Sequence, residues 1–175
     1  MIDLMAWNAD GTRMPWRMHS EYLYRLYLDN ELATNRLPVD GKLIRLSDIR
    51  VPMFVVGTEA DHVAPWKSVY KVDNLVRSDD FTFLLTSGGH NAGIICGPVH
   101  PKRHFRIKTR RLADPHLAPE DWMEAATKHD GSWWPAWQRW LAAHSGAKGK
   151  APTMGAPRKG YRVVEDAPGQ YVRQR

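Results

Sequence analysis

The chain has 175 residues and 43% hydrophobic content, which corresponds to about one domain with an ordinary apolar core. Its net charge of +6 favours anionic partners without choosing among nucleic acid, acidic surfaces and phosphate-bearing substrates. Cys96 is the single cysteine, the N-terminus lacks a signal-peptide pattern, and no apolar run approaches the roughly 18 residues that span a bilayer, so we expect a reducing, cytoplasmic location without internal disulfides.

The first 46 residues carry an aromatic helix. Ser20 is placed to cap a helix that runs to about Leu32, and three tyrosines lie within it. These aromatic side chains suit a cap over a site or a contact between subunits, and plain core packing explains them at least as well. Residues 36–48 form the segment that links this helix to the rest of the chain.

Two short apolar runs predict strands on either side of a helix. The runs are Val51 to Val56 and Phe81 to Leu85, and each ends close to glycine. Between them, Pro65 suits the first turn of a helix, where its missing N–H costs nothing. Strand, helix and strand of these lengths form a parallel β–α–β unit. The sequence therefore predicts an α/β fold.

One polar residue follows each of these strands. Asp61 comes after the first strand and His90 after the second. Loops that follow parallel strands open on the same edge of the sheet, where ligands bind. A carboxylate beside an imidazole fixes its tautomer and stabilises the imidazolium that forms in general-base catalysis, and acid followed by histidine is the order of the α/β-hydrolase triad. We predict that Asp61 and His90 are catalytic; the alternative is two ordinary loop residues.

The segment from His100 to Arg111 contains six lysines or arginines. Phe105, Ile107 and Thr109 alternate with charged residues there, which predicts an edge strand with a solvated face. A charge run is usually solvated surface, and its functional alternative is contact with the phosphates of a nucleotide-containing substrate. Few aromatic residues are interleaved in the run, so nucleic-acid binding is disfavoured.

The C-terminal third carries two helices and a tail. Pro119, followed by two acidic residues, starts one helix, and tryptophans at helical spacing from Trp133 to Leu141 predict another. We interpret these tryptophans as core or interface residues and not as a ligand cage. Residues 146–175 are predicted to be a flexible linker and tail, with a short strand at 161–164 and a turn at 167–172.

A nucleophile for Asp61 and His90 is missing from this sequence. The chemistry needs a serine or cysteine on a tight elbow between glycines, and neither G-x-S-x-G nor its cysteine counterpart occurs. Cys96 follows the histidine instead of preceding the acid, and we interpret it as a small buried hydrophobic residue. Two clear strands are too few for a complete doubly wound sheet and would leave an apolar edge unpaired. The chain is therefore expected to be the C-terminal part of a larger enzyme.

Five motifs spread from residue 7 to residue 172 resemble the C-terminal catalytic portion of polyhydroxyalkanoate synthases (poly-β-hydroxybutyrate polymerases). The Asp-His-x-x-Pro-Trp and Gly-Ser-Trp-Trp-Pro elements are specific in combination. The matching stretches are Trp7-Asn8-Ala9-Asp10 and those at residues 61–66, 88–93, 131–137 and 167–172.

The resemblance implies a partial α/β-hydrolase fold, with C-terminal β–α–β units, part of the cap and peripheral helices. Residues 1–46 would belong to the cap, which in the family helps to form a dimer. Residues 47–145 would form the C-terminal part of the core, and residues 146–175 the linker and tail.

The resemblance also implies a transferase that polymerises 3-hydroxyacyl-coenzyme A through a Cys–Asp–His triad, at polyhydroxyalkanoate granules. Asp61 and His90 fall on the family's catalytic aspartate and histidine, and Asp61 either orients His90 or assists the substrate hydroxyl. No cofactor or metal is implied, since the coenzyme A thioester is the substrate. The isolated chain is expected to be inactive until an N-terminal segment with the cysteine elbow complements it.

Two other interpretations stay open. Asn91 and Cys96 are atypical beside the family pattern, which leaves room for a divergent α/β-hydrolase fragment with another substrate. The chain is alternatively a non-catalytic interaction module that acts through its tyrosine and tryptophan helices.

Overall fold

A computed structural model describes residues 9, 11, 13–100, 102–166 and 169–170. The chain divides into two compact units, Met1–His144 and Ser145–Arg175, and each is described by itself. Most of the motif at residues 7–10, and residues 167, 168, 171 and 172 of the predicted C-terminal turn, lie outside the described residues.

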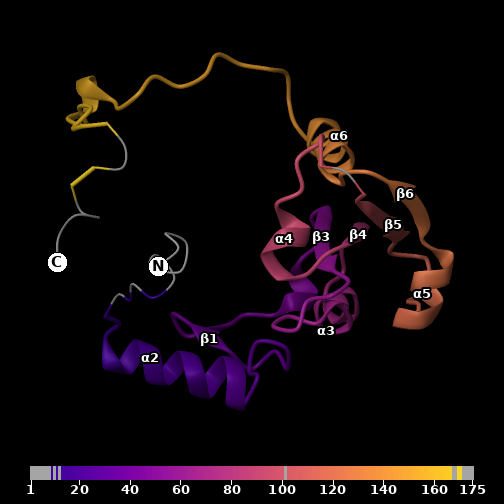
Figure 1. Ribbon diagram of the computed structural model, residues 1–175. Helices are drawn as coiled ribbons and strands as arrows, with labels where there is room; N and C mark the ends of the chain where they lie inside the picture. The colour runs from indigo at the N-terminus through magenta and orange to yellow at the C-terminus, as the bar shows by residue number, and fades with distance from the viewer. Residues whose placement is uncertain (1–8, 10, 12, 101, 167–168, 171–175) are drawn as a thin grey trace. The chain divides into compact units, whose positions relative to one another are not determined.

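A four-stranded mixed sheet forms the centre of the first unit (Figure 1). The strands follow the order β3-β4-β5-β6; β3 and β4 are parallel, and the other two pairings are antiparallel. The predicted parallel β–α–β unit is therefore confirmed, and the α/β class with it. The strands are β3 (Met53–Thr58), β4 (Asp80–Thr86), β5 (His104–Arg111) and β6 (Thr127–Asp130).

The basic run does not form an edge strand, which corrects the sequence prediction. β5 lies between β4 and β6, with Ile107 opposite both Leu84 and Thr127. The edge strand is β6, whose polar sequence Thr127-Lys-His-Asp gives no apolar alternation from which to predict it. The opposite edge is β3, whose outer side has no partner strand among the described residues, as the sequence led us to expect.

The central strand β4 separates two apolar clusters because its side chains alternate between the two faces of the sheet. Phe81, Phe83 and Leu85 point into one cluster, and Leu84 points into the other. All four side chains are at most 1% exposed. The sheet is thus covered on both faces around β4, and this rigid centre positions the loops that follow β3 and β4.

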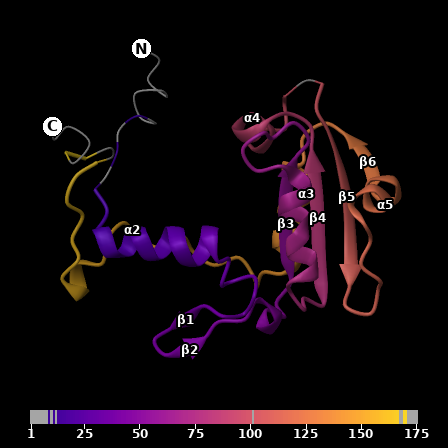
Figure 2. The ribbon, with the colours of Figure 1, turned by 90° about the horizontal axis from the view of Figure 1, so that it is seen from below.

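Short helices cover these faces. α3 (Trp66–Tyr70) continues as a 3-10 turn, η3 (Lys71–Asn74), and packs with α5 (Pro119–Ala125) on the face of Phe83, where Trp122 is buried. α6 (Trp134–Ala143) packs on the face of Leu84. The start of α5 at a proline followed by two acids confirms the sequence prediction, and α3 begins directly after Pro65, as predicted. Figure 2 shows α4 (His90–Ile94) at the end of the sheet to which β3 and β4 point.

The N-terminal segment contains α2 (Trp16–Tyr22), which continues as a π-helical stretch, η1 (Leu23–Leu28). Ser20 lies inside α2, so its predicted role as a cap is wrong; the helix begins after Pro15, whose fixed φ suits that position. A small hairpin follows, made of β1 (Pro38–Val39) and β2 (Lys42–Leu43), and then a 3-10 turn, η2 (Leu46–Asp48).

The second unit contains little regular structure in its described residues. A 3-10 turn, η4 (Pro157–Lys159), is closed by an isolated bridge between Ala156 and Tyr161. The predicted strand at 161–164 is therefore reduced to this one bridge, and Val163 and Val164 are exposed.

Candidate active site

The loops after β3 and β4 are tied together by their own backbones. Glu59 N–H donates to Thr86 O at 2.9 Å, and Ala60 N–H donates to Gly88 O at 3.0 Å. These bonds extend the parallel pairing beyond the last paired residues of the strands. As a result, Asp61 and His90, which the sequence placed on the same edge, lie next to each other.

Backbone N–H groups hold the Asp61 carboxylate. Its Oδ1 accepts hydrogen bonds from Val63 N–H at 2.9 Å and from Ala64 N–H at 2.8 Å, and Thr58 Oγ1 donates to Oδ2 at 3.3 Å. The Ala64 N–H, then the His90 ring and the Val63 N–H, hold the pKa of Asp61 well below its usual range against an opposing effect of burial. Asp61 is therefore ionised at neutral pH, with its side chain 9% exposed.

His90 completes the contact. Its Nδ1 lies 3.0 Å from Oδ2 and 3.1 Å from Oδ1 of Asp61. Because Asp61 is ionised and can only accept, Nδ1 carries the proton and donates it to the carboxylate. Nε2 is the nitrogen that faces away from Asp61 and that accepts a proton when the ring acts as a base; the side chain of His90 is 47% exposed. This is the arrangement of a general base whose tautomer is fixed by an acid.

Glycines bring the histidine loop close to β3. Gly88 has φ of +106°, a conformation that other residues adopt only under strain. A Cβ on Gly93 would lie 2.5 Å from Thr58 Cγ2, and one on Gly89 would lie 3.1 Å from Ala60 O. Side chains at positions 89 and 93 would therefore collide with the end of β3 and the loop that follows it, so glycine is needed at both.

Cys96 lies in the apolar interior. Its side chain is fully buried in the cluster of Leu84, Phe105 and Trp133. The position agrees with its interpretation as a small hydrophobic residue.

The sequence analysis missed a second carboxylate–imidazole contact at the same edge. His104 Nε2 lies 3.2 Å from both carboxylate oxygens of Glu59, and His104 N–H donates to Ser87 Oγ. Glu59 follows β3 and His104 begins β5, so both stand where β4 ends. A histidine within the basic run was the available signal, but only the antiparallel register places it here.

All four arginines of the basic run form hydrogen bonds or ion pairs within the fold. Arg103 donates to Ser87 O and Ala92 O, Arg106 to Ala126 O, Arg110 to Asp73, and Arg111 to Asp80. These bonds connect β5 and its flanking residues to neighbouring loops and helices.

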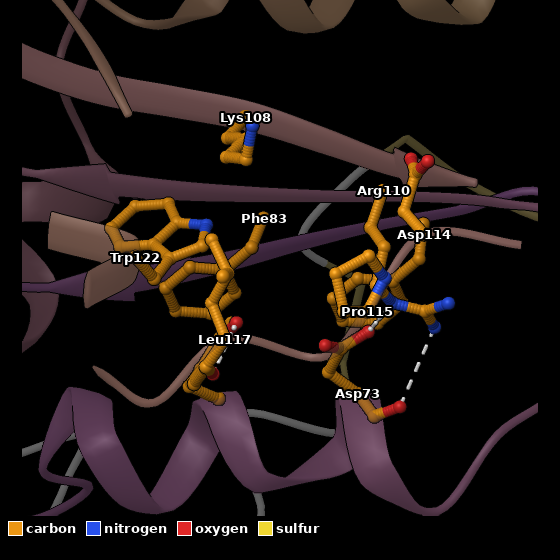
Figure 3. Close-up of a pocket in the computed structure, with 10 residues that line it drawn as sticks. Asp73, Phe83, Lys108, Arg110, Asp114, Pro115, Leu117 and Trp122 are labelled. Carbon is orange, nitrogen blue, oxygen red and sulfur yellow. Dashed lines mark hydrogen bonds and ion pairs between the residues drawn. The ribbon is translucent and has the colours of Figure 1, made fainter. Parts of the chain in front are cut away.

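A separate cavity of about 300 Å³ lies between β4, β5, α5 and η3 (Figure 3). Asp73, 1% exposed, accepts from Arg110 Nε at 2.6 Å and contacts His116 Nδ1 at 2.6 Å. Burial, and then the charge of Asp73, raise the pKa of Tyr70 to about 12. Neither Asp61 nor His90 lines this cavity, whose ionic contacts fix the loop between β5 and α5. No group that could hold a metal ion is found in the described part of the chain.

Fold and site together define an α/β protein with a carboxylate-oriented imidazole where two parallel strands end. No protein-family model matches the chain. Over 174 residues, 99% of its length, the chain is 38% identical to the poly(3-hydroxyalkanoate) polymerase subunit PhaC of Rhizobium etli, and it is 38% identical over 173 residues to that of Cupriavidus necator. It is 35% identical over 173 residues to poly(3-hydroxyalkanoate) polymerase 2 of Ectopseudomonas oleovorans.

The resemblance drawn from the motifs is therefore confirmed: the chain is a homologue of part of the poly(3-hydroxyalkanoate) polymerases. It spans 26%, 28% and 30% of the lengths of these three relatives. No helix among the described residues is both long and apolar enough to cross a membrane.

Proposed function

We propose that this chain supplies the aspartate and histidine of a Cys–Asp–His acyltransferase of the polyhydroxyalkanoate synthase type, as the C-terminal part of a partial α/β-hydrolase fold. The observation that carries the proposal is the 3.0 Å contact between His90 Nδ1 and Asp61 Oδ2 at the ends of two parallel strands. The cysteine comes from a segment outside this sequence. Similarity to the polymerases over nearly the whole chain supports this assignment.

In this mechanism, His90 Nε2 removes the proton from the thiol of that cysteine. The thiolate attacks the carbonyl carbon of a 3-hydroxyacyl-coenzyme A, and coenzyme A leaves and takes the proton from the imidazolium. His90 then removes the proton of the hydroxyl at the end of the growing polyester, which attacks the acyl-cysteine and regenerates the thiol. Asp61 holds the tautomer and stabilises the imidazolium in both halves of the cycle.

The open edge of β3 supports the need for another segment. β3 is apolar over Met53–Val56, and no strand pairs with its outer side among the described residues. A long apolar edge is a site for further strand pairing. Additional strands of the hydrolase sheet, with the cysteine elbow, would pair there.

The test is an assay of coenzyme A release from 3-hydroxybutyryl-coenzyme A, with and without a co-expressed segment that carries a Gly-x-Cys-x-Gly elbow. We expect release only when that segment is present, and a loss of about 10⁴-fold in kcat for His90→Ala. Cys96→Ala is the matched control and should keep full activity. Turnover by the lone chain that survives Cys96→Ala would contradict the proposal.

A non-catalytic interaction module is the second candidate, because the N-terminal helices expose large apolar side chains. Trp16 is 80% exposed, Tyr27 69% and Leu28 72%. Partners in this case are a second copy of the chain or the surface of a polyester granule in the cytoplasm. A function that survives His90→Ala and is lost on Tyr27→Ser would favour this candidate.

A further inference from the structure

The helix that begins with His90 is too short to hold its own position. α4 has five residues, and helices of this length gain little stability from their own hydrogen bonds. The last carbonyl groups of any helix also lack partners within it. The orientation of His90 therefore depends on what contacts this helix from outside.

Two indole groups contact the C-terminal end of α4. Trp133 Nε1–H donates to Gly93 O at 3.1 Å, and Trp134 Nε1–H donates to Ile94 O at 3.0 Å. Trp133 is 5% exposed and packs against Leu84. Trp133 and Trp134 thus donate hydrogen bonds to the carbonyl groups of Gly93 and Ile94, at the end of α4.

Two further side chains bind the carbonyl groups on either side. Ser132 Oγ–H donates to Cys96 O, and the same oxygen accepts from Trp134 N–H at 3.1 Å, which fixes the start of α6. Arg103 reaches Ala92 O at 3.1 Å, and its own carbonyl accepts from Gly131 N–H. The carbonyl groups of residues 92, 93, 94 and 96 each receive a side-chain donor from the start of β5 or the start of α6.

We infer that Trp133 and Trp134 are positioning residues that hold α4, and through it the ring of His90, against Asp61. They act on the helix backbone and do not touch the imidazole. The catalytic consequence of this role depends on the proposed function, whereas the geometric consequence does not. The inference gives the Gly-Ser-Trp-Trp stretch a physical link to the histidine more than 40 positions earlier in the chain.

The experiment uses Trp133→Phe combined with Trp134→Phe in the full chain, because phenylalanine keeps an aromatic ring and lacks the N–H donor. Trp137→Phe is the matched control: Trp137 lies on the same helix, contacts the Trp133 ring at 5.7 Å, and has no hydrogen bond to α4 in the described residues. Nitrogen-15 NMR reports the tautomer of His90, and hydrogen exchange reports the amides of Gly93 and Ile95, which bond to Gly89 O and Asn91 O.

We expect the double variant to lose the single Nδ1–H tautomer of His90 and to exchange the Gly93 and Ile95 amides roughly tenfold faster, with β4 amides unchanged. A purely structural role would raise exchange in β4 and α4 alike and leave the tautomer fixed; that result overturns the inference. An outcome in which the double variant matches Trp137→Phe overturns it as well.

If the double variant unfolds, Trp134→Phe alone decides the question, since Trp134 is partly exposed and its N–H reaches Ile94 O. We expect a smaller loss of the Nδ1–H tautomer of His90 and a smaller increase in exchange of the α4 amides. Unchanged signals from His90 and α4 would refute the inference.

These readouts need no turnover. If the unsubstituted chain releases no coenzyme A even with the elbow segment, the proposed function is overturned. The NMR result on His90 and α4 would still hold.

Discussion

At the scale of single residues, the site depends on one carboxylate whose charge is fixed by its surroundings. Asp61 accepts two backbone N–H groups through Oδ1, and its Oδ2 faces both Thr58 and His90. The aspartate therefore stabilises the turn in which it lies and also orients the histidine ring. This double role explains why a residue so close to the surface is only 9% exposed in its side chain.

The depressed pKa of Asp61 predicts a specific pH dependence of stability. A carboxyl group with a folded pKa below its unfolded value stabilises the fold above the unfolded value, about 3.9, and loses that contribution as the pH falls through the folded value. We expect the stabilisation that the Asp61 carboxylate provides, measured as the difference in unfolding free energy between the unsubstituted chain and Asp61→Asn, to be present at about pH 5 and to shrink as the pH falls below the unfolded value. Urea unfolding at a series of pH values measures this difference.

The control for this titration is Asp130→Asn, since Asp130 lies exposed on the edge strand β6. Its difference from the unsubstituted chain should show no comparable decrease at acid pH. A pH-independent difference for Asp61→Asn would mean that the carboxylate is not held in its charged form by the loop.

At the scale of elements, the position of α4 is set by its neighbours at both ends. Its carbonyl groups accept hydrogen bonds from side chains at the start of β5 and the start of α6. Gly93 lies against Thr58 at the end of β3. The helix is thus held between β3, whose following loop carries Asp61, and the start of α6 with its tryptophans. A small change in this packing reaches His90 directly because the histidine is the first residue of α4.

Gly93→Ala tests this packing. Its Cβ would lie 2.5 Å from Thr58 Cγ2 and 3.2 Å from Ser87 O, so the helix must move. We expect a loss of about 1 to 3 kcal/mol in unfolding free energy, measured by urea denaturation, and a weaker NMR signal of the His90–Asp61 hydrogen bond. Gly97→Ala is matched, because nothing lies within 4 Å of its Cβ position, and should change stability by less than about 1 kcal/mol. Equal effects of the two substitutions would contradict this account of α4.

At the scale of the whole molecule, local signals in the sequence predicted the parallel unit and the Asp61–His90 contact. These features follow from short-range patterns: apolar runs that end near glycine, and polar residues directly after them. Strand β6 could not be predicted, because Thr127-Lys-His-Asp has no apolar alternation and pairs only where β5 offers an edge. The bonds from Trp133 and Trp134 to α4 were missed for a related reason, since their partners lie 40 residues away in the chain.

Net charge is distributed unevenly between the two compact units. Residues 145–175 contain seven lysines and arginines and two acidic residues, so they carry five of the six net positive charges of the chain. The ion pairs of the sheet, such as Arg110 with Asp73, lie within the first unit. The second unit is therefore expected to dominate weak binding to anionic surfaces, which salt screens.

Removal of residues 145–175 tests this division. Because the unit Met1–His144 contains both apolar clusters and the sheet, we expect the truncated chain to unfold at the same urea concentration, within about 0.5 kcal/mol of unfolding free energy. We also expect it to elute from a sulfonate cation-exchange column at markedly lower salt, since most of the net charge is gone. A matched chain in which Lys148, Lys150 and Arg158 are replaced by glutamine should elute between the two.

A truncated chain with lower stability would show instead that the second unit supports the fold of the first. Unchanged elution of the truncated chain would mean that the charges that bind the column lie in the first unit.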